Sequence, residues 1–337
     1  MKAAVVKEAR KMVIEDLPVP EAGPHEVVVK VKYVGICGSD LHLYKDGLLP
    51  PDCVMGHEAT GIVANVGPEV TGWKVGDRTW LCGGGGCGKC EACLRNDFEN
   101  CSYHVSIGMG MLPGAYAEYI KVPSPLMIPL PEDVGLKEAT LLDPLTCAYH
   151  ALVVSGIRAG DSALVIGAGP IGLFVVACLK LFGAKPVILS EPTARRAELG
   201  RELGADVLIN PRTQNLEEKC RELTNDIGPD MVFECVGVPA TILDSVSLVR
   251  KQGKVIWVGF CAQEVTFNPA LWWFKNIAIL MSFGAVREDL MKCLKLIQDK
   301  RVPVERLVSE IISLDELPRA FERLLNPNTE VKILVEF

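Results

Sequence analysis

The chain has 337 residues, of which 49% are hydrophobic and 23% are charged, and its formal net charge is −7 at pH 7. These values indicate a globular protein of one or two domains and argue against nucleic acid or an anionic membrane as the main partner. No apolar run approaches the ~18 residues of a membrane span. Charge interrupts the N-terminus too early for a signal peptide, so we expect a cytoplasmic protein.

Residues 1 to about 145 are predicted to form mostly strands and turns. The segment Glu26–Val34 alternates apolar and polar residues, as a half-buried strand does. Two short apolar runs, Gly61–Val66 and Tyr116–Ile120, are separated by clusters of Gly, Pro and Asp. This part of the chain is therefore expected to be rich in β-structure.

From Ser162 onward, short apolar runs alternate with helical patterns such as Ala194–Leu203 and Pro239–Val249. Strands that alternate with crossover helices form a doubly wound parallel sheet. Six such strands are predicted, at Ala163–Ile166, Val187–Ser190, Val207–Ile209, Met231–Glu234, Lys254–Val258 and Ile277–Phe283.

The C-terminal segment is expected to contain two amphipathic helices, near Asp289–Gln298 and Asp315–Leu325, and a last strand at Val331–Phe337. A strand that follows these helices is predicted to return to the sheet of the first domain. The aromatic run Leu271–Phe274 is expected in the core or at a subunit contact, with part of a substrate pocket as the alternative.

A glycine-rich turn joins the first strand of the predicted parallel sheet to an apolar helix, and it contains Gly167, Gly169, Pro170, Ile171 and Gly172. The G-x-G-x-x-G spacing is weak alone in a chain with 31 glycines, but the flanking strand and helix favour a dinucleotide site over an ordinary loop. The three glycines allow a tight turn, close approach of the backbone to a pyrophosphate, and close helix–strand packing. The helix N-terminus would attract the phosphates.

Glu191 ends the next predicted strand, nineteen residues after Gly172, where the ribose-binding acid of a dinucleotide fold is expected. A carboxylate can accept hydrogen bonds from the ribose hydroxyls of NAD. It would repel a 2′-phosphate at ~4 Å by roughly 4 kcal/mol per unit charge at an effective dielectric of about 20. Arg195 and Arg196 lie a helical turn further on and could attract a phosphate. We predict NAD, with NADP the less favoured cofactor, and include Arg196 in the cofactor site.

The chain has 13 cysteines, and in a cytoplasmic protein these are metal ligands or buried small residues rather than a disulfide framework. Four of them lie close together in the sequence: Cys87, Cys90, Cys93 and Cys101. Four thiolates at this spacing satisfy a tetrahedral zinc ion and leave no open position, which indicates a structural site in a lobe at about residues 82–104.

The four cysteines have two alternative interpretations, an iron–sulfur cluster and a nucleic-acid-binding zinc ribbon. In iron–sulfur motifs of this type the fourth cysteine follows after three residues and precedes proline, whereas here it follows seven residues and precedes Ser102. A zinc ribbon that binds nucleic acid is the second alternative, although only Lys89 and Arg95 are basic nearby. Structural zinc is therefore the prediction.

A second group of chemically capable residues is scattered through the first part of the chain: Cys37, Ser39, Asp40, His42, His57, Glu58 and Asp143. Taken singly, such a cysteine is usually a buried small residue, and such a histidine is usually solvated or hydrogen-bonded. Spacing alone therefore leaves a metal site and these structural roles open, with the structural roles the more frequent.

The pattern Gly-His57-Glu-x-x-Gly61-x5-Gly67, the four cysteines and the later glycine-rich turn together resemble the zinc-dependent medium-chain alcohol dehydrogenases. The resemblance covers essentially the whole chain and is closest to the sorbitol, butanediol and threonine dehydrogenase branch. It implies an α/β protein with a GroES-like β-rich catalytic domain, residues 1–147 and 287–337, and a doubly wound six-stranded parallel Rossmann domain, residues 148–286. It also implies a homo-dimer or homo-tetramer.

The same resemblance implies that Cys37 and His57 are ligands of a catalytic zinc ion. Asp143 is the third candidate ligand and stands where this branch usually has glutamate in a Glu-Pro-Leu motif. Aspartate is one methylene shorter, so its contact with zinc could run through water.

Four neighbouring residues also receive roles from the resemblance. Glu58 matches a carboxylate that can ligate the zinc transiently, and Asp40 matches the partner that orients His57. Ser39 matches the hydroxyl that takes the proton of the substrate, and His42 matches the outer end of that proton relay.

These residue types suit the oxidation of an alcohol, which must lose its hydroxyl proton before hydride transfer. Zinc can lower the pKa of a bound oxygen from ~16 to about 7, and about nine pKa units correspond to roughly 12 kcal/mol. We predict two zinc ions per chain and hydride transfer between NAD and a secondary alcohol, diol or polyol, which is interconverted with the ketone. The alternatives are an NAD-binding protein of the same fold without this activity, a zinc-free reductase of the superfamily, and an NADP-linked ketone reductase.

Overall fold

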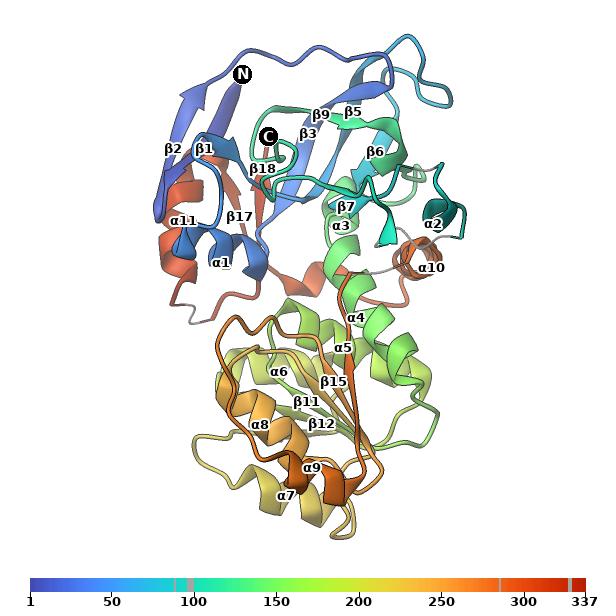
Figure 1. Cartoon of the computed structure of the whole chain (residues 1–337), viewed down its shortest axis with the longest axis vertical. Coiled ribbons are helices and arrows are strands. Elements are labelled where there is room, and N and C mark those ends of the chain that lie inside the picture. The colour runs from blue at the N-terminus through green and yellow to red at the C-terminus, as the bar shows by residue number, and fades with distance from the viewer. Residues whose placement is uncertain (88, 96–99, 285, 327–328) are drawn as a thin grey trace. The chain divides into compact units, whose positions relative to one another are not determined.

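A computed structural model describes residues 1–87, 89–95, 100–284, 286–326 and 329–337 (Figure 1). The chain forms two compact units: the first unit is Met1–Asp143 with Leu294–Phe337, and the second unit is Pro144–Cys293. Among the helices of the described residues, none is both long enough and apolar enough to cross a bilayer.

The first unit consists mainly of strands, as the sequence predicts. Its strands are β1 (Lys2–Glu8), β2 (Lys11–Asp16), β3 (Glu26–Gly35), β4 (Cys53–Val54), β5 (Glu58–Val66), β6 (Arg78–Leu81), β7 (Gly84–Gly85), β8 (Val105–Ser106), β9 (Tyr119–Pro123), β10 (Met127–Pro129), β17 (Val308–Ser313) and β18 (Lys332–Glu336). The largest sheet has the order β10-β6-β5-β3-β18-β17, and β9 also pairs with β3. Strands β2, β1 and β4 form a second sheet, and β7 pairs with β8.

The last strand of the chain returns to the first unit, which confirms that prediction. Strand β18 is antiparallel to β3, and Leu334 lies opposite Gly35. The run Tyr116–Ile120, expected as one strand, becomes a strand only at Tyr119. Residues 115 and 116 bond instead to backbone oxygens of the segment that precedes His57, which pulls them away from the ladder.

The first unit also contains one helix that the sequence predicts, α11 (Leu317–Leu324). Three further helices were not predicted: α1 (Gly38–Asp46), α2 (Glu91–Leu94) and α3 (Leu136–Ala139). The 3-10 turns of this unit are η2 (Ser124–Leu126), η3 (Val304–Leu307) and η4 (Leu314–Glu316). The sequence of helix α1 has no broad apolar stripe, and the helix buries only Asp40 and Tyr44. It starts where the Asp40 side chain accepts a hydrogen bond from the N–H of Cys37, and it ends at Gly47, whose φ is +62°.

The second unit contains the six-stranded parallel sheet that the sequence predicts. Its strands are β11 (Ala163–Ile166), β12 (Val187–Ser190), β13 (Val207–Ile209), β14 (Met231–Glu234), β15 (Lys254–Trp257) and β16 (Ala278–Met281), in the order β13-β12-β11-β14-β15-β16. All residues of β11, β12 and β14 are buried, as expected for apolar strands with both faces covered. The strand order reverses beside β11, where such sheets bind ligands at their carboxyl ends.

Helices precede, connect and follow the strands of the second unit. They are α4 (Leu142–Ser155), α5 (Pro170–Phe182), α6 (Ala194–Glu202), α7 (Leu216–Leu223), α8 (Pro239–Leu248), α9 (Pro269–Lys275) and α10 (Arg287–Gln298), and α4 and α10 each include residues of both units. Helix α5 begins at Pro170, because proline is well suited to the first helical position.

Candidate functional site

Three side chains of the first unit converge and are called here the Cys37 cluster: Cys37, His57 and Glu58. Strands β3 and β5 are antiparallel with Gly35 opposite Glu58, so the residues just beyond the end of β3 lie beside the start of β5. One possible ligand atom from each of the three side chains lies within 4.8 Å of the others. A thiol, an imidazole and a carboxylate form a donor set that suits zinc.

The imidazole of His57 is held by Asp40, which is 0% exposed. The Oδ1 atom of Asp40 lies 3.1 Å from Nδ1 of His57, although neither atom makes a well-aligned hydrogen bond. Burial alone lowers the pKa of His57, but Asp40 and Cys37 together raise it well above its ordinary value. Because Nδ1 faces a carboxylate, Nε2 is the ring nitrogen available to a metal ion.

Lys332 provides a buried positive charge at the Cys37 cluster, which the sequence reasoning did not anticipate. Its Nζ pairs with the carboxylate of Glu58 and donates to the backbone oxygen of Ile36 at 2.9 Å. Burial lowers the pKa of Lys332, but Glu58 and Cys37 raise it above its ordinary value overall. The one feature of the sequence that could have indicated this buried charge is a lysine at the start of the apolar terminal strand β18.

Asp143 lies close to the Cys37 cluster but is not one of the residues whose ligand atoms approach within 4.8 Å. Burial, and then the negative charge of Glu58, raise its pKa to about 6, whereas His57 and Lys332 lower it. The carboxyl group therefore interacts with the cluster electrostatically. Its role as a direct zinc ligand stays a prediction.

Ser39 and His42 lie on helix α1, directly after the Cys37 position. Both are half-buried, and their spacing of three residues places them on the same face of the helix. The proton relay through them stays a prediction.

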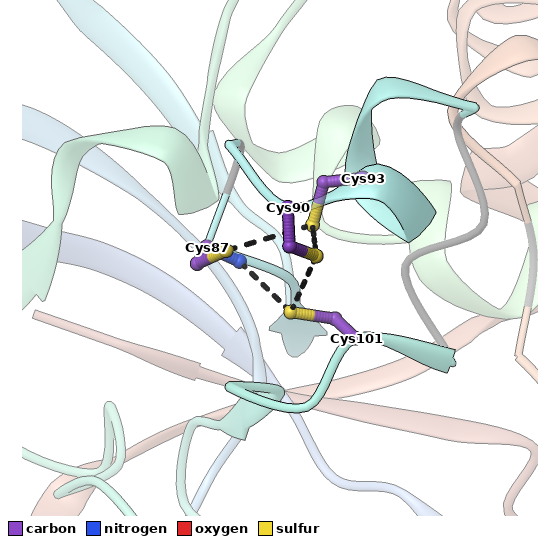
Figure 2. Close-up of side chains that lie close together, drawn as sticks. All are labelled: Cys87, Cys90, Cys93 and Cys101. Carbon is purple, nitrogen blue, oxygen red and sulfur yellow. Dashed lines mark hydrogen bonds between the residues drawn. The ribbon is translucent and has the colours of Figure 1, made fainter.

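The four cysteines of the predicted zinc lobe come together and are called here the four-cysteine loop (Figure 2). Sulfur–sulfur distances are 4.0 Å for Cys87–Cys93, 3.4 Å for Cys90–Cys93 and 3.6 Å for Cys90–Cys101. A tetrahedron with Zn–S bonds of about 2.3 Å has sulfur atoms about 3.8 Å apart, so this set fits zinc.

Backbone N–H groups in the four-cysteine loop favour the thiolate form of its cysteines. Hydrogen bonds from backbone N–H groups, first that of Lys89, lower the pKa of Cys87 to about 6. The N–H of Cys87 likewise lowers the pKa of Cys101. Thiolates are the zinc-binding form of cysteine. Within the predicted lobe, residues 88 and 96–99 lie outside the described residues.

The glycine-rich turn of the second unit has the backbone that its sequence predicts. Gly167 has a φ of +96°, and a Cβ at Gly172 would overlap the Gly167 carbonyl oxygen. A Cβ at Gly169 would meet no atom within 4 Å, so this side of the turn is open. Pro170 and Ile171 form the first positions of α5. The half-buried backbone from Gly169 to Ile171 therefore lies at a helix N-terminus with open space beside Gly169, as binding of a phosphate group requires.

Glu191 lies against this turn. Its two carboxylate oxygens accept hydrogen bonds from the N–H groups of Ala168 and Thr193, each at 2.8 Å, and the residue is 5% exposed. These bonds fix the carboxylate at the carboxyl end of β12. On the following helix α6, Arg195 is exposed and Arg196 is half-buried.

The aromatic run on α9 lies mainly outside the core, which was one of the two places expected for it. Leu271, Trp273 and Phe274 are 65%, 77% and 71% exposed, so these residues do not form part of the core. Only Trp272 packs inward, stacking on Phe267 with ring centroids 3.7 Å apart. Helix α9 is short and projects three of its four large apolar side chains outward.

Comparisons with known proteins agree with both units. Residues 23–132 match the alcohol dehydrogenase GroES-like domain, and residues 170–299 match the zinc-binding dehydrogenase domain. Sorbitol dehydrogenase of Bacillus subtilis (strain 168) is 34% identical over 344 residues, which cover 99% of this chain and 97% of that protein. (R,R)-butanediol dehydrogenase of Saccharomyces cerevisiae (strain ATCC 204508 / S288c) is 32% identical, with 95% and 94% covered. The crystal structure of a zinc-binding dehydrogenase from Sinorhizobium meliloti 1021, bound to NADP, has a TM-score of 0.91 at 31% identity. The match covers 100% of this chain and 99% of that one.

A GroES-like unit and a Rossmann-type parallel sheet with a glycine-rich turn define an oxidoreductase of the alcohol dehydrogenase class. Identity of 34% along 99% of the sequence makes the assignment more specific. The chain belongs to the zinc-dependent medium-chain alcohol dehydrogenase family, which confirms the resemblance and the fold class predicted from the sequence. A purely binding role is not favoured.

Proposed function

We propose that this chain is an NAD-dependent zinc alcohol dehydrogenase that interconverts a secondary alcohol, diol or polyol with the corresponding ketone. The observation that carries the proposal is the convergence of Cys37, His57 and Glu58 within 4.8 Å, with Asp40 behind the imidazole. The known activities of the sorbitol and butanediol dehydrogenases that resemble it support polyols and diols as the substrate class.

Cys37 and His57 would hold the catalytic zinc, and Asp143 or Glu58 would supply the third ligand. Zinc in such a site supplies a Lewis acid that lowers the pKa of an alcohol hydroxyl from ~16 toward 7. Ser39 would accept the proton of the alcohol and His42 would pass it to solvent. The four-cysteine loop would hold a second zinc ion with no open position, and its role would be structural.

The nucleotide would bind to the second unit, along Gly167, Gly169 and the start of α5 at Pro170, Ile171 and Gly172. Glu191 would accept the ribose hydroxyls, with Arg196 at the edge of the same site. We favour NAD because a 2′-phosphate about 4 Å from Glu191 would be repelled by roughly 4 kcal/mol at an effective dielectric of about 20. One similar protein was solved with NADP, so the preference needs a direct test.

We further propose the domain bounds 1–147 with 287–337 for the catalytic domain and 148–286 for the nucleotide domain. All 13 cysteines lie among the described residues and none is joined in a disulfide, which supports our proposal of a reducing, cytoplasmic location. Exposed apolar side chains on α9 and on the edge strand β16, including Trp273 and Met281, support a homo-dimer or homo-tetramer.

The proposal is tested by following absorbance at 340 nm with NAD or NADP and a panel of short secondary alcohols, 2,3-butanediol and sorbitol. We expect reduction of NAD with at least one diol or polyol, loss of activity with a chelator, and its return with zinc. Turnover that is unaffected by complete removal of metal would overturn the zinc mechanism. Faster turnover with NADP at equal concentration would overturn the role of Glu191.

A further inference from the structure

The hydroxyl group of Tyr116 is buried beside the Cys37 cluster and has no part in the function proposed above. Tyr116 is 0% exposed, and its Oη lies 2.7 Å from Oδ2 of Asp40 and 3.2 Å from the backbone oxygen of Gly35. A phenol has one proton to donate, and the nearer acceptor is the charged one. The hydroxyl therefore donates to Asp40.

The hydrogen bonds of Asp40 explain what this contact does. Oδ2 accepts from the Tyr116 hydroxyl and from the backbone N–H of Cys37 at 3.1 Å, while Oδ1 faces Nδ1 of His57 at 3.1 Å. Two donors on one oxygen fix the rotation of the carboxylate and direct the other oxygen at the imidazole. Because Asp40 is 0% exposed, bulk water cannot replace a donor that is lost.

The backbone and ring of Tyr116 are held as firmly as its hydroxyl. Its N–H donates to the oxygen of Met55 at 2.9 Å, and its own oxygen accepts from the N–H of Ala4 at 2.8 Å. Gly56 has a φ of +96°, and a Cβ there would lie 3.0 Å from the Tyr116 ring. The ring thus packs against the residue that immediately precedes His57.

We propose that Tyr116 is a positioning residue for the metal-ligating imidazole of His57 and that it acts through Asp40. The proposal rests on the function proposed above, in which Cys37 and His57 bind zinc. Outer partners of metal-ligating histidines typically change metal affinity by about 10–100-fold, and Tyr116 lies one hydrogen bond further away, so we expect about tenfold.

The test compares Tyr116→Phe with Tyr44→Phe. Tyr44 is a matched control because it is 2% exposed, donates its hydroxyl to the carboxylate of Glu322 at 2.9 Å, and packs edge-on against Phe321 as Tyr116 does. Zinc affinity is measured by competition with a chromophoric chelator. The catalytic zinc is identified as the one that Cys37→Ser lacks. Thermal unfolding of the metal-free proteins is measured in parallel.

We expect Tyr116→Phe to weaken binding of that zinc about tenfold and Tyr44→Phe to leave it unchanged, while both lower the metal-free unfolding temperature by similar amounts. In an Asp40→Asn background, Tyr116→Phe should have no further effect on zinc affinity. Wild-type affinity in Tyr116→Phe, or equal weakening in Tyr44→Phe, would overturn the proposal and leave the zinc site standing. If Cys37→Ser removes no zinc, the proposed function and this inference both fail.

Discussion

The four-cysteine loop and the Cys37 cluster are both candidate zinc sites, but the chain builds them in opposite ways. All four ligands of the loop lie between Cys87 and Cys101, and backbone N–H groups of the same segment support them. The cluster joins Cys37 to His57 and depends on Lys332 from the far end of the chain. A metal site with no open position can take all its ligands from one short segment. A site that keeps a position open for substrate has fewer ligands, and in the Cys37 cluster residues that do not bind metal, such as Lys332, hold the possible ligands in place.

Replacing one cysteine in each region tests most directly whether the two sites have different roles. Cys37→Ser should lower turnover by at least about a thousandfold, since losing even a third of the roughly 12 kcal/mol that zinc supplies has this effect. It should remove one zinc ion and leave the unfolding temperature within about 3 °C of wild type.

Cys93→Ser should remove the other zinc ion and lower the unfolding temperature by about 5–10 °C, because a structural zinc stabilises the fold directly. Metal analysis and calorimetry measure both variants. If the two substitutions have interchangeable effects, the division into a catalytic and a structural site is wrong.

The next largest effect is expected at the buried ion pair of the Cys37 cluster. Lys332→Met leaves the carboxylate of Glu58 buried and unpaired, which should lower the free energy of unfolding by about 3–5 kcal/mol in urea. The matched control is Lys2→Met. The side chains of Lys2 and Asp315 form an ion pair but are each more than half exposed, so loss of this pair should cost under about 1 kcal/mol. Equal losses in the two variants would mean that Glu58 does not need its buried partner.

The glycine-rich turn with Glu191 is a third candidate site, and its proposed ligand is a nucleotide and not a metal ion. Glu191→Ala should raise the KM for NAD about tenfold or more and leave that for the alcohol little changed, since a charged hydrogen bond contributes about 1.5–3 kcal/mol. Asp206→Ala is the control, because Asp206 also accepts a backbone N–H, from Val187 at 2.8 Å, at the other end of β12. Parallel rises in both Michaelis constants would remove Glu191 from the ribose site.

The smallest effect is expected at Asp230, which lies outside both cysteine regions. Burial raises the pKa of Asp230, but hydrogen bonds from Ser162 and Arg250 lower it below its ordinary value overall. This group therefore stabilises the fold fully above pH ~5 and loses that stabilisation as the pH falls through the lowered pKa. Asp230→Asn should cost about 1–2 kcal/mol at pH 7, and this loss should shrink as the pH falls below about 4 and through the lowered pKa. A constant loss across this range would show that the charge of Asp230 is not involved.

The parts that sequence predicts well are those with local causes. The six strands of the second unit are short apolar runs between turn residues, and their predicted limits agree with the structure to within about two residues. The strand, glycine-rich turn and helix at residues 163–182 follow one another in the chain, so their pattern is complete in the sequence.

The parts that the sequence does not reveal depend on distant contacts. Helix α1 has no broad apolar stripe from which it could be predicted, and one of the two residues that it buries, Asp40, is a carboxylate. Lys332 is buried because β18 pairs with β3, which the composition of the strand does not predict. Tyr116 resembles any core aromatic residue until its hydroxyl is found beside Asp40.

We propose above that Cys37 and His57 bind one catalytic zinc ion and that the four-cysteine loop binds a second, structural one. Anomalous diffraction at the zinc edge from crystals of the zinc-loaded protein tests it directly. We expect two peaks per chain, one of them within about 2.5 Å of both Sγ of Cys37 and Nε2 of His57. A single peak, confined to the four-cysteine loop, would contradict it.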